Sequence, residues 1–509
     1  MSNQALTNES REALRKALSS PMGPDDLRKA GVTTGFGLLN YDLQVPAKML
    51  YAMHVPLRAR IPRTKGNGDL GTHWRSIVAI NTANLEGVTT EGNRGLVTTD
   101  NLISRSANYA TLGLDSYVTE EARLGAEGFD DALQKASFNL LNSFLIAEEK
   151  MLLTGNSSNA LGKPTAPSTT LVTTGGSLSA AITVKVAALT AAGYRAATVA
   201  GGCPTTVSGN TGGPQSASIT YNGGTSKTSN GTTQAIGSGS TNSVVVTCPA
   251  VPGAMAYAWF WHGTPGSEAL GAITTSNTVT ITGAAAGTQL ASVFASTDYS
   301  GNAAGFDGLS AIIANSYNAF GSSTDPYGAY WKSLDGATLT PTGSGTIVEI
   351  ENMLVDRWNN YQLGIDTLYV NAQQLMDIRT AVLTGMKNYP LARMDFDPMG
   401  SHAVAGGGSC FRYFSPFAKS ESGNMIDIVL HPYLPAGSMI GVSWTLPYSV
   451  SNVSNPLEVK YQRDVWQTEW PQVRNTYDFS IFSREVLADY APFSLAMIQN
   501  VGAGVTALS

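Results

Sequence analysis

The chain has 509 residues, of which 43% are hydrophobic and 13% are charged, with 53 glycines, three cysteines and a formal net charge of −6. This length predicts about two to four domains of roughly 100–200 residues each. The low charge predicts a surface that is largely covered by neighbouring subunits. The acidic balance and the lack of any Lys/Arg run argue against a tight nucleic-acid binder.

The start of the chain and its most apolar stretch bear on targeting. Residues 1–12 are polar and contain no apolar segment, so we expect no secretory signal. The most apolar long stretch, 180–202, contains Lys185 and Arg195, which argues against a transmembrane helix. We therefore expect a soluble protein that is made in the cytoplasm.

The three cysteines are Cys203, Cys248 and Cys410. They form no Cys-x-x-Cys motif and are too few for a disulfide framework. We expect separate, reduced thiols, as is usual in a reducing compartment. A pair between Cys203 and Cys248, which share one segment, is the alternative.

Residues 1–55 are interpreted as an N-terminal arm. One short helix is predicted over 9–18, and a second over 23–31, where Pro24 suits the first turn and Gly31 the end. Neither is long enough to be stable alone in water. We expect both to lie on a neighbouring subunit.

Residues 56–118 carry strand signals and predict a long two-stranded hairpin that extends from the rest of the chain. The segment 56–62 leads to an outgoing strand over 73–80, a Thr/Gly/Asn-rich tip spans 81–100, and the return strand covers 104–118. An isolated hairpin is at best marginally stable, so this one requires a partner. The densest basic stretch of the chain lies at its start and is interpreted as solvated charges on a loop: Arg58, Arg60, Arg63 and Lys65.

The clearest predicted helix spans 127–153. Asp130 and Asp131 suit the positive end of its dipole, and Gly155 with Asn156 ends it. Apolar side chains recur at helical spacing, at Phe129, Leu133, Ala136, Leu140, Phe144 and Leu145. The spacing predicts a helix with one buried face.

The composition changes sharply over 164–301, which contains only five charged side chains. Strands are predicted there at a spacing typical of β-sandwiches, over 182–186, 217–221, 243–248, 255–261 and 277–283. Within 255–261, Tyr257, Trp259 and Trp261 share one face of the strand. We interpret the segment as an inserted all-β domain.

Mixed helices and strands follow the insertion. One helix is predicted from the spacing of Ile347, Ile350, Leu354 and Trp358. Asn371 and Gln374 form a loose capping box that opens another helix, which carries Leu375, Ile378, Arg379 and Val382. Strands are predicted over 367–370, 410–414, 426–430, 440–444 and 475–486, the last with Tyr477, Phe479 and Ile481 on one face.

Motifs that could support chemistry are few. No two histidines lie within ten residues of each other, and no zinc spacing occurs among His54, His73, His262, His402 and His431. Asp395, Asp397 and His402 are metal-type ligands close in sequence, but a Pro/Gly turn with solvated carboxylates is the simpler interpretation.

Two further motifs have simple structural interpretations. The segment 223–229 is only superficially similar to a phosphate loop, because Lys227 follows Ser226 instead of a glycine. The stripe of Tyr257, Trp259 and Trp261 fits a sandwich core better than a sugar platform. We therefore predict no catalytic, cofactor-binding or metal-binding residue, and no cofactor.

Several stretches share their order and loose motifs with one family: 56–62 followed by 72–75, the helix end at 148–156, 306–309, 426–438 and the strand 475–486. Together they resemble major capsid proteins of tailed bacteriophages with the Hong Kong 97 (HK97-like) fold. The segments 251–259 and 277–282 within the insertion resemble immunoglobulin-like domains, fibronectin type III-like ones best.

The resemblance implies an α+β fold with a set order of parts. These are an N-terminal arm (1–55), a hairpin called the E-loop (56–118), a peripheral (P) domain with a spine helix (119–163), an immunoglobulin-like sandwich insertion (164–301), a return segment of the P-domain (302–345), an axial (A) domain (346–454) and C-terminal P-domain strands (455–509). Some members carry a fused scaffolding region before the E-loop. The stretch here is shorter, so the scaffold is expected to be separate or absent.

The resemblance also implies a structural, non-enzymatic function. Copies of the chain would form hexamers and pentamers of an icosahedral head that encloses double-stranded DNA, assembled in the host cytoplasm and found in the virion. Expected partners are other copies, portal, scaffolding and decoration proteins, and packaged DNA contacted weakly and non-specifically, with no membrane. The insertion would project outward for decoration or for contact with host surfaces or glycans, and deletion of 164–301 should leave assembly possible.

Two other classes of protein remain as alternatives. A cell-surface or S-layer-like protein fits the Thr/Gly-rich β segment, although such a protein has to cross a membrane and no secretion signal is seen. A carbohydrate-active enzyme with an accessory β-sandwich would need two carboxylates at a set separation. Closed shells, flat lattices and hydrolytic activity distinguish the three.

Overall fold

The computed structural model describes residues 50–51, 53–80, 89–95, 97–127, 130–208, 220–237, 239, 241–319, 328–342, 345–385, 412–417, 425–448 and 450–502, with 78–80, 101 and 383–385 described by backbone alone. The chain divides into two compact units, Met1–Tyr51 with Leu124–Asp131 and Ala52–Arg123 with Ala132–Ser509. The helices expected over 9–18 and 23–31 lie outside the described residues, as do Cys410 and the segment 395–402.

In the first unit, the described part includes the end of helix α4 (Glu120–Ala126). The turn after it is closed by the Asp130 N–H, which donates to the Ala126 carbonyl 2.9 Å away. The following description concerns the second unit.

The two strands predicted over 73–80 and 104–118 form an antiparallel pair at the start of the second unit. Strand β2 (Gly71–Ile80) pairs with β3 (Asp100–Asn108), from Gly71 opposite Asn108 to Ile80 opposite Asp100. The return strand predicted over 104–118 divides in two, because β4 (Ala110–Thr119) leaves β2 and pairs with a different strand, β21 (Thr476–Asp489). The hairpin is therefore continuous with a larger sheet at its base.

The start of this region differs from its strand prediction. Residues Pro56–Arg60 form a short helix, α3, followed by strand β1 (Arg63–Lys65). Pro56 occupies the first helical turn, where its missing N–H costs nothing. The helix is too short to form from local preference alone, so contacts with distant residues must stabilise it.

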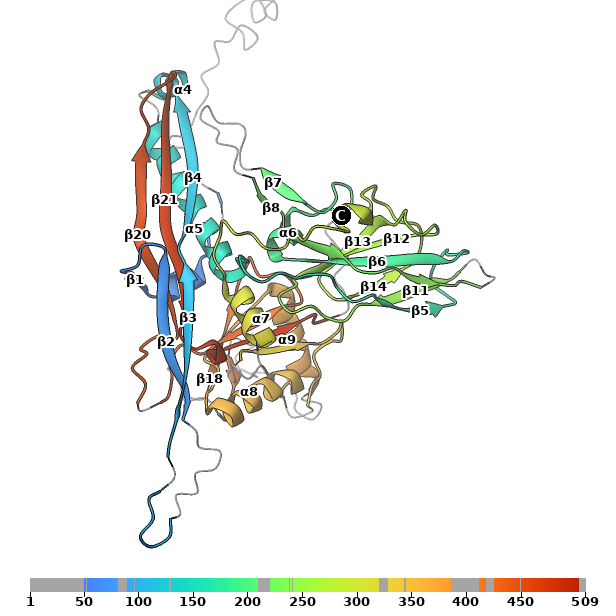
Figure 1. The fold of residues 1–509 in the computed structure, drawn as a ribbon. Coiled ribbons are helices and arrows are strands. Elements are labelled where there is room, and N and C mark those ends of the chain that lie inside the picture. Colours follow the sequence, from blue (N-terminus) through green and yellow to red (C-terminus); the bar gives the residue numbers. More distant parts are fainter. Residues whose placement is uncertain are drawn as a thin grey trace, which may run out of the picture. The chain divides into compact units, whose positions relative to one another are not determined.

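A four-stranded sheet in the order β1–β20–β21–β4 receives the hairpin base (Figure 1). Strand β20 (Leu457–Glu469) pairs antiparallel with β21, and β1 pairs parallel with the first residues of β20. The strand predicted over 475–486 is confirmed as β21, with Phe479 and Ile481 buried.

The long helix α5 (Ala132–Thr154) packs on this sheet. It begins five residues later than predicted, and 23 residues make it about 35 Å long. Leu140 and Phe144 lie in one buried cluster with Val118, Phe479 and Ile481, as the apolar stripe predicted. The helix ends at Gly155 as expected, where a Cβ would lie 2.5 Å from the Phe306 carbonyl oxygen.

The segment 164–301 contains two antiparallel sheets. One has the order β10–β6–β12–β13, with β9 also paired to β6, and the other has the order β14–β11–β5. The strands are β5 (Ser168–Val172), β6 (Ile182–Leu189), β9 (Thr225–Thr228), β10 (Thr232–Gln234), β11 (Ser243–Thr247), β12 (Ala256–His262), β13 (Ala269–Thr274) and β14 (Thr278–Ile281). A small hairpin, β7 (Thr206–Ser208) with β8 (Thr220–Asn222), and the short helices α6 (Ala191–Ala196) and η2 (Ala291–Phe294) complete the segment.

Strand β12 is buried on both faces. Tyr257, Trp259 and Trp261 pack in one cluster with residues of the opposite sheet, including Val244 and Ile281. This confirms the core interpretation of the aromatic stripe, because buried rings cannot form a sugar platform. Ala256, Ala258 and Phe260 face a second cluster that includes Phe294 of η2 and Cys203.

A six-stranded mixed sheet, in the order β15–β22–β19–β16–β18–β17, forms the last part of the second unit. Its strands are β15 (Tyr330–Ser333), β16 (Thr367–Val370), β17 (Arg412–Phe414), β18 (Met425–Leu430), β19 (Met439–Val442) and β22 (Leu495–Gln499). The helices packed with it are α7 (Leu309–Ala319), α8 (Val348–Tyr361) and α9 (Ala372–Gly385). The sheet extends across the boundaries expected at 345 and 455, because β22 pairs with β19 of the segment 346–454 on one side and with β15 on the other.

The predicted capping at the start of α9 is partly as expected. The Asn371 Oδ1 accepts from the Gln373 N–H at 3.0 Å, one residue earlier than in a capping box. Gln374 is buried instead of reaching back. On α8, Ile350 and Leu354 are buried, as their spacing predicted.

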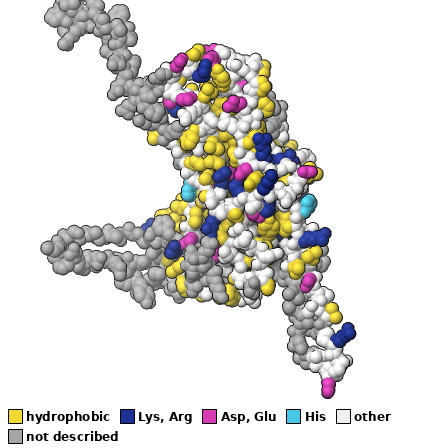
Figure 2. Space-filling view, turned by 90° about the vertical axis from the view of Figure 1, so that its left-hand side faces the viewer, with side chains coloured by type: hydrophobic (Ala, Val, Ile, Leu, Met, Phe, Trp, Pro, Cys, Tyr) yellow, Lys and Arg dark blue, Asp and Glu magenta, His cyan; other side chains and the backbone are white. Residues whose placement is uncertain are grey.

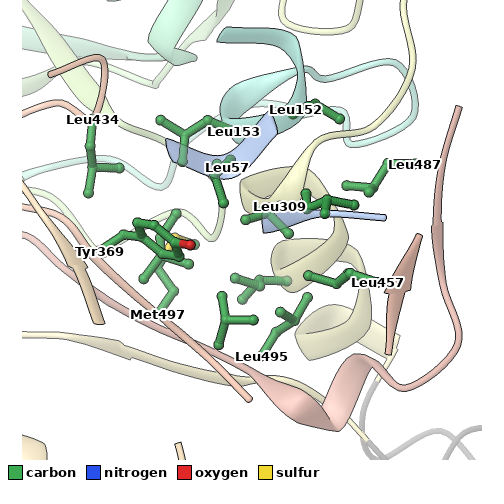
Figure 3. Close-up of a cluster of buried hydrophobic side chains, with 14 of the residues drawn as sticks. Leu57, Leu152, Leu153, Leu309, Tyr369, Leu434, Leu457, Leu487, Leu495 and Met497 are labelled. Atoms are coloured by element: carbon green, nitrogen blue, oxygen red, sulfur yellow. The ribbon is translucent and has the colours of Figure 1, made fainter. Parts of the chain in front are cut away.

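One large core joins the parts of the second unit (Figure 3). Leucines from α3, α5 and α7 meet side chains from the four-stranded and six-stranded sheets: Leu57, Leu152, Leu153, Leu309, Leu457, Leu487, Leu495 and Met497. Met255 and Ala191 of the insertion belong to the same cluster. The insertion therefore shares a core with the rest of the second unit.

Candidate functional site

The motifs singled out in the sequence do not form a chemical site in the described residues. The segment 223–229 is not a phosphate loop, since Lys227 lies within strand β9, which pairs with β6. Among the residues described, no group of three or more His, Cys, Asp or Glu side chains could hold a metal ion. Within the same residues, no helix is long and apolar enough to cross a membrane.

Cys203 and Cys248 are free and buried, which confirms the expectation of separate thiols. They belong to different clusters, Cys203 to the one around Phe260 and Cys248 to the one around Trp259. Burial raises the pKa of both thiols to about 12. Thiolate chemistry is therefore suppressed at both positions.

A largely buried ionic cluster lies at the hairpin base. We call it the base cluster: Arg58, Arg63, Glu148, Glu149, His431, Asp464 and Glu485. Glu148, Glu149, His431 and Glu485 have fully buried side chains. Such groups persist in an interior only when they are paired or hydrogen-bonded.

The Glu149 side chain stabilises the short helix α3. Its Oε1 accepts from the Leu57 N–H at 2.9 Å, and its Oε2 accepts from the Arg58 N–H at 2.8 Å. Val55 at the N-cap supplies no side-chain hydrogen bond of its own. The carboxylate of α5 thus caps the N-terminus of a helix about 90 residues away, where the backbone N–H groups and the dipole favour a negative charge.

His431 completes this capping arrangement. Its Nε2 lies 2.8 Å from the Glu149 Oε1, and its ring stands edge-on to Tyr369 with centroids 6.1 Å apart. His431 follows β18, so it connects the six-stranded sheet to α5 and, through Glu149, to the hairpin base. Burial, and then the Glu149 charge, raise the pKa of Tyr369.

Arg63 on β1 is the centre of the other half of the cluster. Its NH1 donates to Glu148 of α5, and its NH2 lies 2.6 Å from both the Asp464 Oδ1 of β20 and the Glu485 Oε2 of β21. The Glu148 Oε2 also accepts from the Arg58 Nε at 2.7 Å. The solvated-loop interpretation of the basic stretch is therefore wrong for Arg58 and Arg63, since each pairs with a buried carboxylate.

Burial and the close approach of like charges shift the pKa values of the groups around Arg63. Burial, and then the neighbouring Glu148 charge, raise the pKa of Glu485 to about 7, although Arg63 acts in the opposite direction. Burial acts to lower the pKa of Arg63, but the charges of Glu485 and Glu148 outweigh it and the pKa is raised. Burial acts to raise the pKa of Asp464, but hydrogen bonding and Arg63 lower it overall.

On the side of the molecule that carries β1 and β20, Lys and Arg side chains lie near the middle of the face with Asp and Glu among them (Figure 2). A face of this kind does not have the single-sign potential that would attract a polyanion.

The hairpin itself exposes an apolar pair. Ile77 and Leu102 are opposite each other across β2 and β3, and they are 62% and 52% exposed. We call them the hairpin pair. Such a pair contributes little in water and more when another surface covers it.

A groove of about 360 Å³ lies between α5 and the outer half of β20. It is lined by Gln134, Ser137, Phe138, Leu141, Val465, Trp466, Gln467 and Ile481. Phe138 is 49% exposed there. The groove is apolar with neutral polar groups, and it holds no titratable side chain in its lining.

The two ends of the insertion are tied together. The Asn302 N–H donates to the Asn156 carbonyl at 2.8 Å, and the Gly308 N–H donates to the Gly155 carbonyl at 2.9 Å. The Asp307 Oδ1 accepts from the Ser157 N–H at 2.7 Å. The chain thus leaves and returns to the end of α5 through one narrow neck.

The base of the sandwich also contacts the six-stranded sheet. The Gln499 Nε2 donates to the Ala254 carbonyl at 3.1 Å, and the Asn277 Nδ2 donates to the Asp335 Oδ1 at 2.7 Å. These contacts explain why Met255 belongs to the shared core.

Sequence reasoning missed the base cluster. It placed Glu148 and Glu149 at the end of the long helix and His431 after a strand, but it could not show that these residues meet. The signal that was available is the Glu-Glu pair on the buried side of an amphipathic helix, which requires cationic or N–H partners from elsewhere.

Comparison with known proteins finds no matching family model and no matching curated protein. Solved structures that are similar include the capsid of a native GTA particle, with a TM-score of 0.43, 8% identity, and coverage of 93% of this chain and 99% of that one. The capsid of cyanophage A-1(L) gives a TM-score of 0.41 with 11% identity, covering 91% of this chain and 98% of that one. The SrpI encapsulin complex of Synechococcus elongatus PCC 7942 gives 0.39 with 8% identity, covering 92% and 95%.

Proposed function

We propose that the chain is a shell-forming structural protein, the major capsid subunit of a tailed phage with the HK97-like fold. The order of parts in the chain supports this proposal: a hairpin, a long helix, an inserted sandwich, a mixed sheet with its helices, and two long closing strands. In this scheme the hairpin is the E-loop, α5 the spine helix, the β1–β20–β21–β4 sheet the P-domain and the six-stranded sheet the A-domain.

The observation that carries the proposal is the contrast within the hairpin. Its base is fixed by ion pairs to buried carboxyl groups of α5 and β21, while the hairpin pair further out is more than half exposed. Two strands alone are marginally stable in water. An anchored, partly apolar hairpin is suited to lie on another copy of the chain, and a closed shell repeats such a contact in a symmetric way.

The inserted sandwich is proposed to be an immunoglobulin-like domain that decorates the outside of the shell. Its two antiparallel sheets, of five and three strands, pack around one shared core, as the two sheets of that fold do. The first two strands of the insertion, β5 and β6, lie in different sheets, and β6 pairs with β12. Contact with host surfaces or glycans, and enclosure of DNA, belong to the same proposal.

Negative-stain electron microscopy of the full chain, expressed alone and purified by size exclusion, tests the proposal. We expect closed shells, or rings of five and six subunits. Flat two-dimensional lattices would replace the capsid proposal with a surface-layer function. A monomer at high concentration that also stays monomeric when the other head proteins are co-expressed would contradict shell formation.

A further inference from the structure

The base cluster contains more acid than base around Arg63. Glu148, Asp464 and Glu485 all accept hydrogen bonds from its guanidinium. The other cation of this half is Arg58, which donates to Glu148. Two guanidinium groups therefore face three carboxyl groups, two of which, on Glu148 and Glu485, are fully buried.

Glu485 is the carboxyl group with the fewest partners. Its Oε2 accepts from Arg63, while its Oε1 accepts no hydrogen bond from any residue in the described part of the chain. A buried oxygen of this kind costs free energy when the group is charged, but much less when it carries a proton. Glu485 is therefore the position in the cluster where a proton is best accommodated.

Four elements place side chains around Glu485. Strand β1 contributes Arg63, α5 contributes Glu148, β20 contributes Asp464 and Tyr461, and β4 places Ala110 opposite it. Arg58 of α3 reaches Glu148. Among the residues that the structure describes, Arg63 is the one cation that contacts Glu485, so loss of the Glu485 proton leaves a third negative charge that Arg63 does not fully offset.

We propose that the base cluster is a proton-operated latch, in which a proton on Glu485 holds α3 and β1 against α5 and the sheet, and loss of that proton loosens the hairpin base. Helices α3 and α5 and strands β1, β20 and β21 meet at the hairpin base, and each supplies at least one member of the cluster. A change in its charge therefore acts at the point where the hairpin joins the body. The inference goes beyond the proposed function and does not require it, because opening can be measured in the unassembled chain.

The direction of the pH effect follows from linkage. The pKa of Glu485 is about 7 in the closed arrangement, against an ordinary value of 4.5. The closed state thus binds a proton more tightly than an opened one, so closing is favoured at low pH and is weakened as the pH rises from about 4.5 to about 7. Above that range both states have lost the proton and the effect levels off.

Hydrogen exchange of the full-length chain, measured from pH 5 to pH 8.5, tests the latch. The reporters are backbone amides over 57–66, which bond to Glu149 and to β20. After correction for intrinsic exchange rates, we expect their protection to fall by on the order of 50-fold between pH 5 and pH 8. Protection of amides in β12, which lies away from the cluster, should stay constant.

Glu485→Gln is the decisive variant, since it keeps the shape and removes the titration. We expect high protection at every pH. Asp464→Asn removes a neighbouring negative charge and should shift the midpoint of the wild-type transition to lower pH. Asp115→Asn, an exposed carboxyl on β4 of the same sheet, is the matched control and should reproduce the wild-type profile.

Either of two outcomes would overturn the latch. One is protection over 57–66 that does not change with pH in the wild type. The other is an unchanged pH profile in Glu485→Gln. If Glu485→Gln does not fold, Asp464→Asn provides the test. A pH midpoint of protection that is the same in Asp464→Asn and in the wild type would then overturn the latch.

Discussion

Glu149 and His431 are 282 residues apart in the chain, yet the Glu149 Oε1 and the His431 Nε2 are separated by 2.8 Å. Both side chains are fully buried. The same carboxylate caps α3, so one side chain of α5 positions both the hairpin base and the end of β18. Glu149 therefore connects three parts of the second unit: α5, the hairpin base and the six-stranded sheet.

Replacing Glu149 with alanine should therefore be costly. The change leaves the N–H groups of Leu57 and Arg58 and the His431 ring without their acceptor in a buried site. We expect the free energy of unfolding to fall by about 3 kcal/mol. The measurement is the denaturant midpoint, with Glu469→Ala, an exposed glutamate on β20, as a control that should change by less than about 0.5 kcal/mol.

A double-mutant cycle measures the pair itself. Glu149→Ala and His431→Ala should each destabilise the chain, and the double variant should be less destabilised than their sum. We expect a coupling of about 1–3 kcal/mol, as for residues in one hydrogen-bond network. Strict additivity would show that the two side chains contribute independently, which would contradict a direct connection through Glu149.

The elements that the sequence predicted well have a strong periodic signal. The stripe of α5 and the alternation in β12 depend on local spacing, and both are found. Strand β22 is buried along its whole length, so its short apolar run has no period to detect. Strand β20 has register shifts between Tyr461 and Trp466, which break the alternation that would reveal a strand.

The base cluster could not be found from sequence for a different reason. Each of its contacts joins residues far apart in the chain: Arg63 meets Glu148 across 85 residues and Glu485 across 422. Local composition indicates only that charges occur there. The strand prediction for Pro56–Arg60 failed for the same cause, since a carboxylate of α5 caps that helix.

The ion pair of the insertion predicts a pH dependence of opposite sign to that of Glu485. Burial acts to raise the pKa of Glu268, but the Gly266 N–H and Lys185 outweigh it, so the pKa is lowered. A lowered pKa stabilises the fold above the ordinary value near 4.5, and this contribution is lost as the pH falls through the folded value. Glu268→Gln should thus destabilise the insertion by about 1 kcal/mol at pH 7.

The difference between this variant and the wild type should shrink as the pH falls from 7 towards 3, because protonation of Glu268 removes the charge that the variant lacks. Denaturant midpoints of the two proteins at pH 7 and at pH 3 give the comparison. A difference that is as large at pH 3 as at pH 7 would assign the effect to packing and not to charge.

The hairpin pair should matter for association and not for folding. Ile77→Ser with Leu102→Ser removes exposed apolar surface, so the denaturant midpoint should change by less than about 0.5 kcal/mol. Shell or ring formation should be lost or reduced at least tenfold, as followed by size exclusion. Val450→Ser, at a position that is 94% exposed outside the hairpin, is the matched control and should assemble normally.

Deletion of 164–301 tests how far the insertion is separable. The Asn302 N–H and the Asn156 carbonyl are 2.8 Å apart, so a linker of a few glycine and serine residues can join the cut ends without distorting α5 or α7. The deletion also removes Met255 and Ala191 from the shared core and leaves Gln499 without its Ala254 partner. We expect a folded chain that still assembles, with a denaturant midpoint lowered by the equivalent of about 2–5 kcal/mol, as for loss of one large core side chain.

The fragment 157–308, expressed alone, is the complementary measurement. It retains both sheets of the sandwich and the Asp307 contact that closes the neck, so it should unfold in a single cooperative transition. A deletion variant that fails to fold, together with a fragment that shows no cooperative transition, would mean that the two parts form one folding unit. In that case the shared core around Met255 would be essential to both parts.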